Sequence, residues 1–99
     1  IVDYAEKYDL NYVNFLNLVE EISIDYTKDT YDEGLHMNLS GAEKCGDYLG
    51  RYLKETYHLK DKRKDKAIVA DWKKKEAFYD QLKEAQYKEL EKYGEIRSY

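Results

Sequence analysis

Asp32 and His36 stand four residues apart in a polar stretch, residues 25–38, and are the pair in this chain best suited to chemistry. A carboxylate beside a histidine can hold its Nδ1–H, fix the tautomer and stabilise the imidazolium that forms when Nε2 takes a proton from a nucleophile. Asp29 and Glu33 are alternative acids for the same ring. The pattern therefore predicts a general base, His36, and an orienting acid, with Asp32 as our first choice.

The segments around this loop predict a strand before it and a helix after it. Residues 1–8 fit one face of a short helix, and residues 12–16 form a short run rich in β-forming side chains. Ser40 and Glu43 frame a capping box, S-G-A-E, so a helix is expected to start at Ser40. Strand ends in open α/β sheets deliver side chains to a shared crevice, and a loop between strand and helix is well placed for catalysis.

Two helices joined by a charged linker account for the rest of the chain. Apolar residues at intervals of three and four predict helices over 42–57 and 68–93, with Gly94 as the stop signal of the second. Residues 58–66 carry five cationic and two acidic side chains and are typical of a solvated connector. We expect the second helix to bury its apolar stripe, Trp72 included, on the first.

The composition predicts a thin core. Ile, Val, Leu and Phe together supply 21 of the 99 residues, while Tyr alone supplies 12. The net charge of −4 argues against a nucleic-acid-binding surface over the whole domain. The single cysteine, Cys45, excludes an intrachain disulfide and a cysteine zinc site, and no metal or cofactor is expected. No apolar stretch approaches the roughly 18 residues of a membrane span. The chain opens with Ile1 and not with methionine, which predicts a fragment of a longer protein.

The block from 32 to 44 resembles the C-terminal block of SGNH (GDSL-type) hydrolases. It reads D-E-G-L-H-M-N-L-S-G-A-E-K, close to the D-x-G-L-H-x-N and G-A-E-K of many bacterial relatives. The resemblance covers about residues 1–57. The chain departs from the family in spacing, because the family's acid and histidine stand three apart and Glu33 takes that place here. Gly34 can absorb the extra residue, since glycine permits positive φ.

The resemblance implies an α/β fold, with residues 1–57 as the C-terminal segment of a flavodoxin-like hydrolase domain, 58–66 as a linker and 67–99 as a helical extension. It implies a serine esterase or acyltransferase that acts on an acylated small molecule or on acyl groups of a carbohydrate or cell-envelope polymer, at an extracytoplasmic or cell-envelope location. Asp32 and His36 would complete its catalytic triad, and Asn38 would brace the loop.

The family's Gly-Asp-Ser nucleophile segment and its oxyanion donors are missing from this sequence. The chain alone is therefore expected to be inactive and to need the remainder of the hydrolase domain as partner. The alternative is a noncatalytic helical interaction module whose 68–93 helix binds a partner. If that helix finds no cover within the chain, two copies are expected to pair through Trp72, Phe78, Tyr79 and Leu82.

Overall fold

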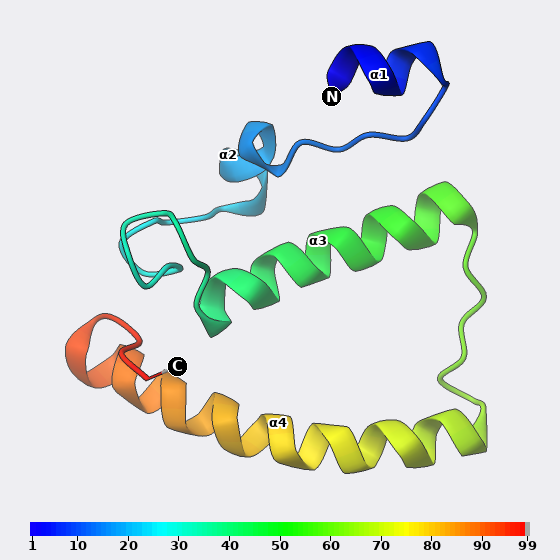
Figure 1. The fold of residues 1–99 in the computed structure, drawn as a ribbon. Helices are drawn as coiled ribbons and strands as arrows, with labels where there is room; N and C mark the ends of the chain where they lie inside the picture. Colours follow the sequence, from blue (N-terminus) through cyan, green and yellow to red (C-terminus); the bar gives the residue numbers. More distant parts are fainter. Residues whose placement is uncertain (99) are drawn as a thin grey trace.

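The computed structural model describes residues 1–98, which are folded mainly into helices joined by loops (Figure 1). In chain order these are α1 (Val2–Lys7), a 3₁₀ helix η1 (Phe15–Leu18), α2 (Val19–Ile22), α3 (Leu39–Tyr57) and α4 (Lys66–Tyr93). Among the described residues, no helix combines the length and the apolar character needed to cross a bilayer.

The predicted α/β, flavodoxin-like fold is wrong. The described chain contains no sheet, and its β-type pairing is limited to an isolated antiparallel bridge between Thr30 and Met37. The strand predicted over 12–16 is also wrong. Oδ1 of Asn14 accepts the backbone N–H of Leu16 at 3.1 Å and begins η1 instead. β-forming residues make a strand only where a neighbouring strand pairs their N–H and C=O groups, and no described segment does so.

Helix α3 begins earlier than the capping box predicts. Its N-cap is Asn38, whose Oδ1 accepts the N–H of Gly41 at 3.2 Å, so Ser40 already lies in the first turn. Ser40 Oγ donates to a buried carboxylate, Asp29, and the Glu43 carboxylate binds side chains of α4. Both residues of the predicted box are thus used for tertiary contacts, which replaces the local cap.

Helix α4 ends where the sequence predicts and begins two residues before. Asp65 caps it, with Oδ1 accepting the N–H groups of Ala67 and Ile68 at 3.1 and 3.3 Å. Gly94 ends it at φ 77°, a left-handed conformation that favours glycine. At the other end of the linker, His58 closes α3 at φ 50°.

Helices α3 and α4 run in opposite directions and are joined by residues 58–65 (Figure 1). They are tied together by Glu43, which accepts hydrogen bonds from Tyr79, Lys83 and Tyr87 at 3.2, 2.6 and 2.7 Å. The expected burial of Trp72 on α3 is not found, because this residue is 57% exposed. The helices are therefore fastened where α3 starts and leave the first half of α4 open.

The core is as thin as the composition predicts. Among the described residues, the buried hydrophobic side chains are Ala5, Ile22 and Ile96. Five polar residues are also buried, namely Asp29, Thr30, Asn38, Ser40 and Gln86. Most of these polar residues surround the start of α3. Hydrogen bonds therefore hold residues 25–38, which we call the candidate loop, in place more than apolar packing does.

Candidate functional site

The structure brings Asp32 and His36 together. Asp32 Oδ2 lies 2.5 Å from Nδ1 of His36, and its Oδ1 accepts the backbone N–H groups of Leu35 and His36 at 3.0 and 2.6 Å. The His36 side chain is 77% exposed, and no described residue bonds its Nε2. The hydrogen bond from the His36 ring, followed by those from the two N–H groups, holds the pKa of Asp32 below its usual value. One carboxylate therefore fixes both the ring and the backbone of the histidine.

A tight turn explains how two residues four apart can face each other. Glu33 has φ 56° and Gly34 has φ 117°, both in the left-handed region. These two conformations curl the chain, so that Asp32 and His36 come to the same side despite the extra residue. At Gly34 a Cβ would also lie 3.2 Å from the ring of Tyr26, so both the backbone and the space favour glycine there.

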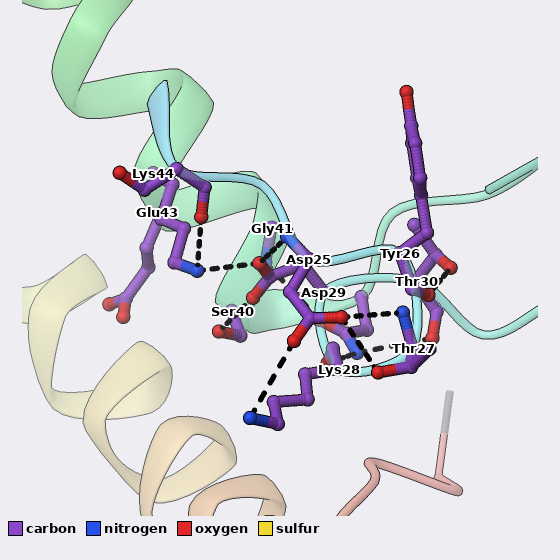
Figure 2. A network of polar contacts seen from close by, with 12 residues as sticks. Asp25, Tyr26, Thr27, Lys28, Asp29, Thr30, Ser40, Gly41, Glu43 and Lys44 are labelled. Atoms are coloured by element: carbon purple, nitrogen blue, oxygen red, sulfur yellow. Dashed lines mark hydrogen bonds and ion pairs between the residues drawn. The ribbon is translucent and has the colours of Figure 1, made fainter. Parts of the chain in front are cut away.

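The two alternative acids do not bond to His36. Glu33 is exposed and makes no hydrogen bond within the described chain. Asp29 is 1% exposed and faces the start of α3 instead. Its Oδ1 accepts Ser40 Oγ at 2.6 Å, and its Oδ2 lies 2.5 Å from Lys44 Nζ (Figure 2). Asp29 is thus an anchor for the loop.

Asp29 stays ionised in this buried place. Its Oδ2 also accepts the backbone N–H of Asp25 at 2.8 Å. Burial by itself raises the pKa of Asp29, but the N–H of Asp25 and the Lys44 and Ser40 side chains outweigh it and lower the pKa below the usual 3.8. The carboxylate therefore clamps the 25–29 turn to the first turns of α3.

Asn38 braces the other side of the loop, as expected. Its Nδ2 donates to the carbonyl oxygens of Lys28 at 2.6 Å and Thr30 at 3.4 Å, while its backbone N–H donates to the carbonyl of Asp29 at 3.1 Å. The close approach of the loop to α3 needs Gly41, because a Cβ there would lie 2.2 Å from the carbonyl oxygen of Asp29.

A C-terminal brace on the loop escaped prediction from the sequence. The hydroxyl of Tyr31, next to Asp32, donates to the carbonyl of Ser98 at 3.1 Å. Gln86 Nε2 donates to the same carbonyl at 3.0 Å, and Glu89 accepts the N–H and the hydroxyl of Ser98. No periodicity or spacing could reveal this contact, because it joins residues 67 apart in the chain.

An apolar hollow of about 220 Å³ lies against the same loop. Leu35 and Met37, on either side of His36 in the chain, help to line it, and both are exposed. Other lining residues come from η1, α2 and α3, among them Phe15, Ile22 and Cys45. Burial, with the Asp29 charge second, raises the pKa of the Cys45 thiol, which makes it a poor nucleophile.

No serine of the described chain is hydrogen-bonded to His36. Ser40 and Ser98 donate their hydroxyls to Asp29 and Glu89, and Ser23 ends α2 in a left-handed conformation. Among residues 1–98, no group of three or more His, Cys, Asp or Glu side chains could hold a metal ion.

An exposed imidazole oriented by a carboxylate can take a proton at Nε2 from a nucleophile brought to it. The Asp32–His36 pair has the geometry for this proton transfer, and Leu35 and Met37, its neighbours in the chain, line the apolar hollow. No protein-family model, curated protein or solved structure matches this chain in comparison searches.

Proposed function

We propose that this chain is the C-terminal portion of an SGNH-like serine esterase or acyltransferase and supplies its general base, His36, and orienting acid, Asp32. The observation that carries the proposal is the 2.5 Å contact between Asp32 Oδ2 and His36 Nδ1, on a ring that is 77% exposed. The carboxylate keeps the imidazole in the Nδ1–H tautomer, and the open Nε2 accepts the proton of the attacking serine.

The nucleophile and the oxyanion donors come from polypeptide outside these 99 residues. Two of the three serines have their hydroxyls engaged elsewhere, on Asp29 and Glu89. An oriented base without a nucleophile or oxyanion hole has little to act on, so the isolated chain is inactive on simple esters.

The substrate is an acyl group carried by a carbohydrate or another polymer of the cell envelope. The apolar hollow of about 220 Å³, lined in part by Leu35 and Met37 on either side of His36 in the chain, supports the acyl part of this assignment, because its apolar lining suits an aliphatic chain. The carbohydrate part, and an extracytoplasmic location with it, rest on the likeness of the 32–44 block to the hydrolase family.

The decisive experiment uses the full reading frame. We expect a Gly-Asp-Ser segment upstream of Ile1 and ester turnover by the full-length protein. His36→Asn should abolish that turnover, and Asp32→Asn should lower it by about 10⁴-fold, because the imidazole then loses its orienting acid. His58→Asn is the matched control and should leave the rate unchanged, since asparagine tolerates the left-handed conformation of this cap. Near-normal turnover in both site variants would contradict the proposal.

A second candidate function is a noncatalytic helical module that binds a partner through α4. The observation in its favour is the exposure of large apolar side chains on that helix, 57% for Trp72 and 75% for Phe78. A full reading frame without a Gly-Asp-Ser segment would favour this candidate. In one version of this candidate, the partner is a second copy of the chain, bound through the same side chains.

A further inference from the structure

Charge is distributed very unevenly along this acidic protein. Residues 58–75, which are the linker and the first part of α4, carry eight cationic and three acidic side chains. The remaining residues carry nine cationic and eighteen acidic side chains. An anionic ligand is therefore drawn to one end of the molecule and repelled by the rest.

Two hollows lie in this cationic region. The first, about 430 Å³, is lined by the second half of α3 and by the linker, and includes Arg51, Lys54 and Lys60. The second, about 460 Å³, lies between the linker and α4, and includes Trp72 and Lys73. Both volumes are typical of ligand sites, which span about 300–1,000 Å³. The hollows share a lining residue, Arg63, so they adjoin each other.

Four lysines in these hollows are available to an anion. Within the described chain, no carboxylate lies within ion-pair distance of Lys54, Lys60, Lys62 or Lys73. The other cations are already paired, Arg63 with Asp61 and Arg51 with Asp47. Lys54 acts on the Asp61 carboxylate only at longer range than an ion pair. An incoming carboxylate or phosphate thus meets four ammonium groups that have no close ion pair to break.

Trp72 adds an aromatic face to the second hollow. The residue is 57% exposed and is flanked there by Ile68 and Val69, which also line the hollow. Lys75 Nζ lies over the indole, 5.3 Å from the ring centroid. The rest of the exposed ring is a flat apolar surface, and such a surface suits the C–H face of a sugar ring. The one carboxylate in the lining, Glu76, leaves the second hollow with a net positive charge.

We propose that these two adjoining hollows bind an acidic polysaccharide, with one sugar ring stacked on Trp72 and its anionic groups held by Lys54, Lys60, Lys62 and Lys73. Two adjoining hollows suit a chain of repeating units. Charged side chains, Lys62, Arg63, Lys73 and Glu76, line the second hollow together with Trp72. An anionic membrane surface is the competing occupant that the vesicle measurement below tests. His36 precedes the start of α3, whereas the hollows are lined by α3 from Gly46 onward, by the linker and by the first part of α4, so the site is separate from the proposed chemistry.

Trp72 is the only tryptophan in the chain, so its fluorescence reports directly on the second hollow. Titration with polygalacturonate at low salt should change this fluorescence in a saturable way, and added salt should reverse the change, since exposed charges are screened. Dextran, a neutral polysaccharide, should have no effect at the same concentration. Calorimetry of the same titrations gives the affinity without relying on the fluorophore.

Three variants test the residues. Trp72→Ala should weaken binding by about three- to tenfold through the lost stacking. The double variant Lys62→Gln with Lys73→Gln should weaken it by about fivefold. The matched control, Lys88→Gln with Lys92→Gln, removes the same charge from the far half of α4 and should change the affinity by less than about twofold. Circular dichroism should show the same helix content in all of them, because every altered side chain is exposed.

Several outcomes would overturn the proposal. Absence of binding to polygalacturonate is one, and equal losses in the control and site variants is another. Equal affinity for poly-L-glutamate or single-stranded DNA would show that charge alone decides, and a fluorescence change with phosphatidylglycerol vesicles alone would assign the surface to a membrane. A dimer in sedimentation that Trp72→Ala dissociates would show that a second copy occupies the hollow.

Discussion

The carboxylate of Asp32 organises its loop from within. It holds the His36 ring at 2.5 Å and accepts two backbone N–H groups of the same turn. Glu33, at the three-residue spacing of the family block, is turned out by the left-handed backbone that brings Asp32 into place. The choice between these acids is therefore made by the backbone conformation of the turn and not by residue count.

Asp29 gives the loop a stability that depends on pH. Its carboxylate is buried and its pKa is lowered in the folded state, so the stabilisation is fully present above the usual value of 3.8. It is lost as the pH falls from that value through the lower folded pKa. Asp29→Asn should remove this acid-sensitive component and destabilise the fold by about 1–3 kcal/mol at neutral pH, because charge-assisted hydrogen bonds are lost.

Urea unfolding at a series of pH values measures both effects. Asp47→Asn is the control, since that side chain is 73% exposed and pairs only with Arg51, the next turn along α3. We expect the control to retain the stability of the unaltered chain within about 0.5 kcal/mol. A parallel loss in both variants, or an acid transition that survives Asp29→Asn, would count against the anchoring role.

At the scale of elements, α3 matters most because its first turns hold the candidate loop. Gly41 lies in that turn with the carbonyl of Asp29 directly above it. Gly46 and Gly50 lie farther along the same helix, and nothing is within 4 Å of a Cβ placed on either. One helix thus contains glycines of two kinds, one needed for close approach and two in open surroundings.

Gly41→Ala should destabilise the protein by about 1–3 kcal/mol, because the new methyl group would meet backbone that has to shift. Gly46→Ala and Gly50→Ala should instead stabilise it by about 0.5–1 kcal/mol each, since alanine is the better helix former. Thermal melts of the three variants compare identical chemical changes within one helix. Similar effects in all three would show that the loop is not packed on α3 as described.

At the scale of the whole molecule, stability is concentrated where α3, the loop and the C-terminal residues meet. Ile96, among the C-terminal residues, is 3% exposed, while the large aromatic Trp72 is 57% exposed. The size of a side chain is therefore a poor guide to how much it stabilises this fold. The N-terminal part contacts α3 through the hydrogen bond from Asn11 to Tyr57 at 3.1 Å, the edge-to-face pair of Phe15 and Tyr48, and the hydrogen bond from Lys44 to the carbonyl of Ser23.

Ile96→Ala should cost about 2–5 kcal/mol, the usual range for truncating a buried aliphatic side chain. Trp72→Ala should cost less than about 1 kcal/mol, because water already covers most of the indole. Chemical unfolding of the two variants at one protein concentration shows which substitution costs more stability. A larger loss for Trp72→Ala would mean that its indole is buried in solution, against a second copy or against α3.

The sequence by itself determined the local features of this protein. Helical periodicity predicted α3 and α4. Gly94 predicted the end of α4, where the backbone takes a left-handed conformation that favours glycine. The scarcity of aliphatic residues predicted the thin core. Asn38 was likewise identified as a brace of the loop. Helix periodicity and end signals depend on neighbours a few residues away, and the core depends on overall composition, both of which a sequence displays directly.

Only the tertiary structure decided the rest. Whether residues 12–16 form a strand depends on a pairing partner, and the described chain provides none. Whether Ser40 caps α3 or binds Asp29, and whether Trp72 is buried or open, depends on which distant surface lies opposite. The brace from Ser98 to Tyr31 spans 67 residues. Such contacts are set by packing and by the need of buried polar groups for partners, and neither leaves a periodic trace in the sequence.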